Sequence, residues 1–214
     1  MNRASLSHFC LVLAALLAGC GQAERPTDAT TANFEHAVRS YLAVRGDLCI
    51  NRSSWPVVVT NEEFAQGSRN SVQLPVLEKL GLVRSSVVDA VAGDEDAKHP
   101  TRARRYELTE AGKPYYLAHA PYRRAPEHAR ADHDFCAAKL TLKHIEGWTP
   151  PTSTQPGAQT IVSYTYDVAP APWTADSDAR KVFPMVDRVL RGAGTMKLQE
   201  PMVLTAEGWE AKDL

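Results

Sequence analysis

The chain has 214 residues, with 24 Lys and Arg against 25 Asp and Glu and a formal net charge of −1 at pH 7. This near-neutral balance gives no global sign of nucleic-acid binding, and the 14 prolines indicate a loop-rich, non-repetitive fold rather than a repeat array. The length is enough for one large hydrophobic core or two small ones.

The first 19 residues have the parts of an export signal. Arg3 supplies a basic start, Phe9 to Ala18 form an apolar run, and Ala18-Gly19 are small residues before Cys20. Ten apolar residues rise only about 15 Å as a helix, about half of a bilayer core, so they do not predict a spanning helix. No later segment approaches the roughly 18 apolar residues that a membrane span needs.

Leu17-Ala18-Gly19-Cys20 resembles the lipobox, the processing signal of bacterial lipoproteins. The resemblance implies cleavage before Cys20 and acylation of that cysteine, and two or more acyl chains anchor a protein stably. Gly21 follows in place of aspartate, which in this family implies sorting to the outer membrane. We therefore expect a membrane contact through the N-terminal lipid and a location on the outer membrane, facing the periplasm. The alternative is an ordinary secretory signal with a chance cysteine.

Residues 20–32 hold the acylated cysteine and then small and polar side chains, which predict a flexible tether. With Cys20 acylated, Cys49 and Cys136 are the remaining cysteines of the mature chain. In an oxidising compartment such a pair favours a disulfide over two buried thiols. In the chain-entropy model, a bridge over nearly ninety residues stabilises by about 4–5 kcal/mol, and often less in practice.

The first predicted domain covers residues 33–120. Its apolar spacing predicts a helix from Phe34 to Leu42, with Asn33 as N-cap and Gly46 past the end. The elements that follow are a strand at 57–59, a brief helix capped by Thr60 or Asn61, a helix over 72–80, strands at 82–88 and 104–108, and a polar connection at 90–101. Pro75 is expected only near the first turn of its helix.

This order of elements resembles a winged helix. Two segments carry the resemblance: Leu77-Glu78-Lys79-Leu80-Gly81-Leu82-Val83 and Tyr106-Glu107-Leu108-Thr109-Glu110-Ala111-Gly112, which are similar to the helix end and strand end of regulators of the MarR and PadR kind. The resemblance implies a winged-helix-like fold and says little about function. The expected recognition helix carries Arg69 and Lys79 against Glu78, with few groups for phosphates or bases, so we expect no nucleic-acid partner.

Residues 121–133 are expected to be a linker, and residues 134–214 a small α+β domain. Alternation predicts strands over 138–145 and 160–168, the second with Val162, Tyr164, Tyr166 and Val168 on one face. A helix is expected over 177–190, kinked or restarted at Pro184, followed by a hairpin or bulged strand over 196–204. The predicted class is α+β, with a winged-helix-like domain followed by a small antiparallel sheet and one packed helix.

A basic stretch suggests one candidate binding site. The residues that could pair with an anionic ligand are Arg102, Arg104, Arg105, Arg123 and Arg124, and the favoured alternative is an ordinary solvated surface.

Metal and catalytic sites find little support. His119, His128 and His133-Asp134 lack a zinc motif, and the histidines are expected to be surface side chains, so we predict no metal ligands and no cofactor. A pair of Cys49 with a distant histidine is conceivable, but a disulfide accounts better for the cysteines. No catalytic residue is predicted.

The sequence therefore predicts a lipid-anchored envelope protein of binding or scaffolding type, which contacts an envelope protein or an anionic wall or lipid component. One alternative is an envelope hydrolase or metal-dependent enzyme without a familiar motif. Another, should the lipobox be false, is a cytoplasmic winged-helix DNA-binding regulator.

Overall fold

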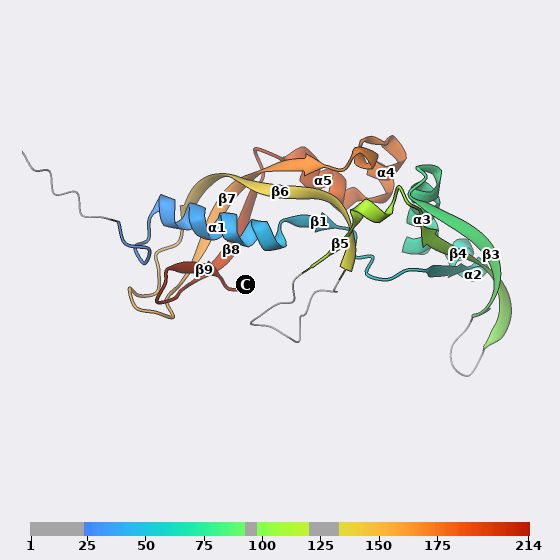
Figure 1. The fold of residues 1–214 in the computed structure, drawn as a ribbon, viewed down its shortest axis with the longest axis horizontal. Coiled ribbons are helices and arrows are strands. Elements are labelled where there is room, and N and C mark those ends of the chain that lie inside the picture. The colour runs from blue at the N-terminus through green and yellow to red at the C-terminus, as the bar shows by residue number, and fades with distance from the viewer. Residues whose placement is uncertain (1–23, 93–97, 120–132) are drawn as a thin grey trace, which may run out of the picture.

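The computed structural model describes residues 24–92, 98–119 and 133–214, and it is a mixed α/β fold with two antiparallel sheets (Figure 1). The large sheet has the order β1-β6-β7-β8-β9, with β5 also paired to β6. Its strands are β1 Asp47–Cys49, β5 Tyr116–Ala118, β6 His133–Trp148, β7 Gln159–Pro170, β8 Lys197–Leu204 and β9 Trp209–Ala211. The small sheet has the order β2-β4-β3, from β2 Val57–Thr60, β3 Val83–Ala92 and β4 His99–Leu108. The mixed class and the antiparallel pairing agree with the sequence prediction.

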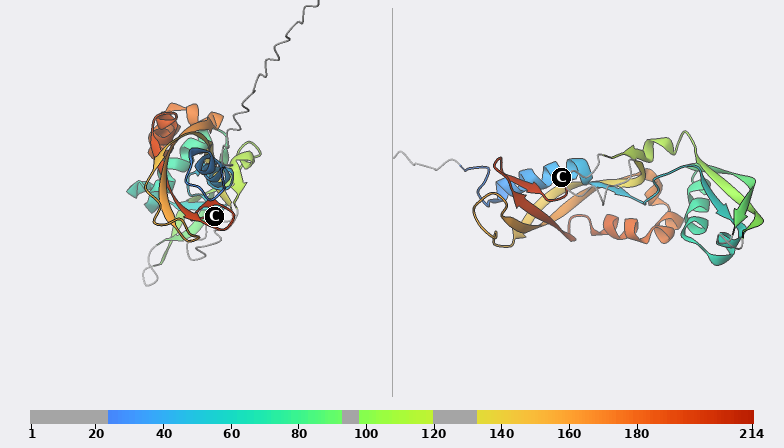
Figure 2. Two further views of the ribbon diagram at one scale, coloured as in Figure 1. Left: turned by 90° about the vertical axis from the view of Figure 1, so that its left-hand side faces the viewer. Right: turned by 90° about the horizontal axis from the view of Figure 1, so that it is seen from below.

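Helix α1, Thr31–Arg45, packs on the large sheet, which curls around it (Figure 2). Its N-cap is Thr30, whose hydroxyl accepts from Asn33 N at 3.3 Å, so the predicted cap Asn33 already lies inside the helix. Gly46 follows the helix as predicted. The winged-helix resemblance would require this helix to pack on the next two helices, whereas its apolar face lies in the core of the large sheet. That core contains Phe34, Ala37, Val38, Leu42, Leu140, Leu142, Ile145, Val162, Tyr164, Tyr166, Met202, Leu204 and Trp209.

The other helices of the described residues surround a second core. They are α2 Asn61–Gln66, α3 Arg69–Lys79, α4 Ser177–Val182 and α5 Pro184–Gly192, with 3₁₀ turns η1 Lys113–Tyr115 and η3 Pro172–Ala175. α3 contacts α4, where Gln73 donates to Val182 O at 3.0 Å. Residues from both halves of the chain fill this core, including Leu74, Leu77, Val83, Tyr106, Phe135, Trp173 and Phe183. Each of the two cores therefore draws on residues before 120 and after 133.

Several boundaries differ from the prediction. α3 begins at Arg69, after the N-cap Ser68, so Pro75 lies in the second turn and not in the first. Burial of Leu74 and Leu77 beside it offsets the lost backbone donor. β3 and β4 extend into the predicted connection at 90–101, because they pair from Val83↔Leu108 out to Ala92↔His99. Residues 197–204 form one continuous strand, β8, and the hairpin is formed by β8 with the next strand, β9. Pro184 begins α5, as predicted.

The segment before α1 is folded from Arg25 onward, unlike the flexible tether predicted for residues 20–32. Arg25 and Asp28 form an ion pair at 2.9 Å, and Asn33 Nδ2 donates to Arg25 O at 2.7 Å. Pro26 lies against Gly208 in the turn between β8 and β9. The predicted signal, residues 1–19, and Cys20 lie outside the described residues. Among the residues that the structure describes, no helix is long and apolar enough to cross a membrane.

Candidate functional site

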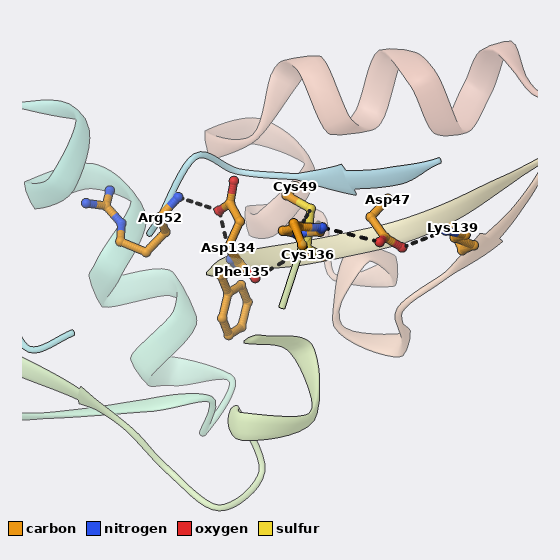
Figure 3. Close-up of a disulfide and its surroundings, with 8 residues drawn as sticks. Asp47, Cys49, Arg52, Asp134, Phe135, Cys136 and Lys139 are labelled. Carbon is orange, nitrogen blue, oxygen red and sulfur yellow. Dashed lines mark hydrogen bonds and ion pairs between the residues drawn. A yellow bond between two sulfur atoms is a disulfide. The ribbon is translucent and has the colours of Figure 1, made fainter. Parts of the chain in front are cut away.

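Two strands that are far apart in the sequence bring the cysteines together. β1 pairs antiparallel with β6, Cys49 lies opposite Cys136 with Cα atoms 3.8 Å apart, and the two sulfurs form a disulfide (Figure 3). Cys136 is buried, and Cys49 is partly exposed at the end of its strand. The pair that the cysteine count predicts therefore joins the first half of the chain to the second.

His119 packs directly on this disulfide. Its Nε2 lies 3.6 Å from Cys49 Sγ and 3.5 Å from Cys136 Sγ, and the residue is only 8% exposed. The prediction of a surface histidine at this position is wrong. β5 pairs with the start of β6, with Ala118 opposite His133, and this places the next residue over the cysteines. A lone histidine after three strand residues gives no sequence signal for such a contact.

A carboxylate and an ammonium group lie behind the imidazole. Asp47 Oδ2 is 3.6 Å from His119 Nδ1, and Lys139 Nζ is 3.4 Å from Asp47 Oδ1 (Figure 3). Asp47 and Lys139 face each other in the β1–β6 register, and Lys139 Nζ also donates to Ala43 O at 3.0 Å. At 3.6 Å the Asp47 carboxylate is beyond hydrogen-bond distance of Nδ1, but it lies on that side of the ring, while Nε2 is the ring nitrogen that lies next to both sulfurs.

Asp134 has a structural role beside this group. Its Oδ1 accepts from Arg52 N at 2.5 Å and from Phe135 N at 2.7 Å, so it fixes the chain after β1 to the start of β6 (Figure 3). The Asp134 side chain is buried. His133 is exposed, as expected, and stacks on Tyr116 with ring centroids 5.1 Å apart. His128 lies outside the described residues.

The chemistry of this group depends on the state of the cysteines. A disulfide sulfur is neither the nucleophile nor the metal ligand that a thiolate is, so the bridge is a structural link while it is closed. Within the described part of the chain, the ligand atoms of Cys49, His119 and Cys136 lie within 4.8 Å of one another. Two sulfurs and an imidazole nitrogen are donors that zinc prefers in proteins.

The predicted anion-binding arginines are each paired with an acid where the structure describes them. On β4, Arg102 pairs with Asp89 at 3.4 Å, Arg104 with Glu78 at 4.0 Å and Arg105 with Glu107 at 2.9 Å. Arg104 also lies over the Phe64 ring, 6.0 Å from its centroid. These acids offset most of the positive charge of this sheet, although Glu107 also pairs with Arg84 at 3.3 Å. Arg123 and Arg124 lie outside the described residues.

A second buried polar group lies between α1 and the large sheet. Glu200 on β8 is 6% exposed, and burial raises the pKa of its carboxyl to about 7, against a hydrogen bond from Tyr41 that lowers it. Burial and the nearby Glu200 carboxyl raise the pKa values of Tyr41 and Tyr164. The alternation of buried and exposed residues along β8 could have predicted a buried position for Glu200. Glu200 shares the strand face of Met202 and Leu204, both of which are buried.

In the part of the chain that the structure describes, these two groups, at the disulfide and at Glu200, are the candidate sites. Comparison of the chain with family models, with curated proteins and with solved structures finds no match, so the assignment of function depends on the geometry described above.

Proposed function

We propose that this chain is a lipid-anchored protein of the bacterial cell envelope, attached through Cys20, whose folded body binds or scaffolds an envelope protein. The observation that carries the proposal is the Cys49–Cys136 disulfide. Disulfides persist in oxidising compartments such as the periplasm and are rare in the bacterial cytosol. The bridge and the lipobox-like Leu17-Ala18-Gly19-Cys20 therefore support the same location by independent arguments.

The geometry supports a body held close to the membrane at one end. Five residue steps lead from Cys20 to the folded turn at Arg25, and five extended steps reach at most about 18 Å. The start of α1 lies at one end of the long axis, and the small sheet with α2 and α3 lies at the other (Figures 1 and 2). An anchor at Cys20 would present the small sheet toward the periplasm.

We further infer that residues 57–108 form a winged-helix-like unit. The support is its order, β2-α2-α3-β3-β4, with β4 paired between β2 and β3. The unit lacks the first helix of the expected pattern, since α1 packs on the large sheet.

The surface of this unit favours a protein partner over nucleic acid. On α3, Arg69 donates to Ile50 O, and Lys79 pairs with Asp178 at 2.7 Å. The two basic groups that could contact phosphates are thus used within the fold, as are the paired arginines of β4. Ion-paired basic side chains offer little net charge to an anionic polymer, whether nucleic acid or cell-wall material.

Labelling with fatty acid in a Gram-negative host tests the anchor. Label is expected in the membrane fraction for the wild type and for Cys10→Ala, which keeps the acceptor, and it is expected to be absent from Cys20→Ala. The Cys10→Ala variant is the matched control, because it also removes one cysteine from the N-terminal segment. Full-length, unlabelled wild-type protein in the cytosol would overturn the proposal.

A further inference from the structure

We propose that reduction of the Cys49–Cys136 disulfide creates a zinc-binding site, with Cys49 Sγ, Cys136 Sγ and His119 Nε2 as ligands. The protein would then alternate between a closed, bridged state and a reduced, metal-bound state. This inference goes beyond the proposed anchoring and binding role and does not depend on it.

The positions of the three ligand atoms carry the proposal. Zn–S bonds of about 2.3 Å and Zn–N bonds of about 2.0–2.1 Å at tetrahedral angles place sulfur and nitrogen about 3.5 Å apart. His119 Nε2 already lies 3.6 Å and 3.5 Å from the two sulfurs. After reduction the sulfurs need only to separate to about 3.8 Å, the tetrahedral S···S distance for the same bond lengths, which side-chain rotation can supply. The fourth position is left for water or another ligand.

The groups around the imidazole are the second observation. Histidines that bind a metal almost always direct the other ring nitrogen at a carboxylate, a carbonyl or water, which fixes the tautomer. Here Asp47 Oδ2 faces Nδ1 at 3.6 Å, and Lys139 faces Asp47 in turn.

The charge balance of the site also suits both states. A divalent cation with two thiolates and a neutral imidazole carries no net charge, and neither does a disulfide beside the same imidazole. Because Cys136 and His119 are buried, a site with a net charge would be costly there, and this one avoids that cost in either state.

The change of state has a defined balance. A small dithiol reduces the bridge by thiol–disulfide exchange, so two electrons and two protons pass to the cysteines and the dithiol becomes a disulfide. Binding of Zn²⁺ then releases the two thiol protons. In the opposite direction, a disulfide reagent accepts two electrons from the two thiolates and two protons from solvent, and it leaves as two thiols. The bridge closes again and Zn²⁺ is released.

Cobalt binding tests the proposal with the full chain carrying Cys10→Ser and Cys20→Ser, so that Cys49 and Cys136 are its remaining thiols. The protein is reduced with a dithiol, freed of reductant without oxygen and titrated with Co²⁺. We expect one Co²⁺ per chain, a thiolate-to-cobalt charge-transfer band and the intense visible bands of tetrahedral cobalt. Zn²⁺ should displace Co²⁺, and the oxidised protein should show no bands.

Three variants separate this site from a nonspecific dithiol. His119→Ala should weaken Co²⁺ binding by more than about 100-fold, because one ligand is lost. Asp47→Asn should weaken it by about 10–100-fold, because the carboxylate beside His119 Nδ1 is lost. His144→Ala, at an exposed position on β6, is the matched control and should bind as the parent does. Equal affinity in His119→Ala and the parent would overturn the proposal, as would reduced parent protein that shows no charge-transfer band.

Circular dichroism covers the case in which the reduced protein loses its fold. Recovery of the native spectrum on addition of Zn²⁺, in the parent and not in His119→Ala, would support the site. A reduced parent that stays unfolded with Zn²⁺ present would count against it.

Discussion

Glu200 shows how a single position can make stability depend on pH. Its carboxyl is buried on β8 under α1, and burial raises its pKa from the ordinary value of 4.5 to about 7. The folded state therefore holds this proton more tightly than the unfolded chain does. The associated stability is fully present below about pH 4.5 and is lost as pH rises through 7, because ionisation of the buried acid opposes folding. At 1.36 kcal/mol per pKa unit, the full difference amounts to about 3 kcal/mol.

We expect Glu200→Gln to flatten this dependence. The free energy of unfolding of the variant should exceed that of the wild type by about 1–3 kcal/mol at pH 8, and the gap should close near pH 4.5. Denaturant unfolding at a series of pH values measures both quantities. Glu207→Gln, at an exposed turn, is the control and should follow the wild-type curve. A Glu200→Gln curve parallel to the wild type at all pH values would contradict the argument.

At the scale of elements, the two segments that resemble winged helices are parts of one contact. The end of α3 leads through Gly81 and Leu82 into β3, and the end of β4 leads into Thr109. Thr109 Oγ1 donates to Gly81 O at 2.6 Å, and Thr109 N donates to Leu82 O at 3.1 Å. Gly112 then lies against the Leu82 carbonyl. The motif is therefore a local solution for joining a helix end to a strand end, which explains why it says little about function.

Gly112→Ala should disrupt this junction. A Cβ at that position would overlap the Leu82 carbonyl oxygen, a backbone atom that cannot rotate away, so we expect a loss of about 3 kcal/mol in the free energy of unfolding. Ala111→Gly is the neighbouring control, exposed in the same turn, and should cost less than about 1 kcal/mol. Urea denaturation of the two variants distinguishes these values, and equal losses would count against a steric cause.

Sequence patterns predicted the starts of helices α2 and α5, because these starts depend on residues that are close in the sequence. Of the two predicted caps, Thr60 is the N-cap of α2. Its hydroxyl accepts from Glu63 N at 3.2 Å, and Glu63 Oε2 accepts from Thr60 N at 2.8 Å, which makes a capping box. The restart at Pro184 follows in the same way from the geometry of proline. The extent of β3 and β4 could not be predicted, because cross-strand pairing makes polar residues part of the strands.

At the scale of the whole molecule, the pairing of β1 with β6 could not be derived from the sequence. A three-residue strand has too few positions for a periodic signal, and its partner begins more than eighty residues later. The same pairing creates the candidate site, since it places Asp47 opposite Lys139 and Cys49 opposite Cys136. The cysteine count predicted a bridge, but the position of His119 depends on the β5–β6 pairing and gave no sign in advance.

The bridge should make a measurable contribution to the stability of the whole fold. It joins residues separated by 87 positions and ties β1, which leads from α1 toward the small sheet, to the long strand β6. We expect the double variant Cys49→Ala and Cys136→Ala to lose about 2–4 kcal/mol in the free energy of unfolding. Denaturant unfolding of the full chain, with and without a dithiol and with a chelator present, measures this loss.

The reductant separates the bridge from the side chains that form it. Dithiol should lower the wild type to about the level of the double variant and leave the double variant unchanged, because only the wild type has a bond to lose. A wild-type curve that dithiol does not shift would contradict the expected contribution. If the chelator is replaced with Zn²⁺ at 100 times its dissociation constant, the reduced wild type should recover about 2.7 kcal/mol, and the double variant should recover nothing. The same two sulfurs would then stabilise the fold in both states, through the bridge when oxidised and through bound Zn²⁺ when reduced.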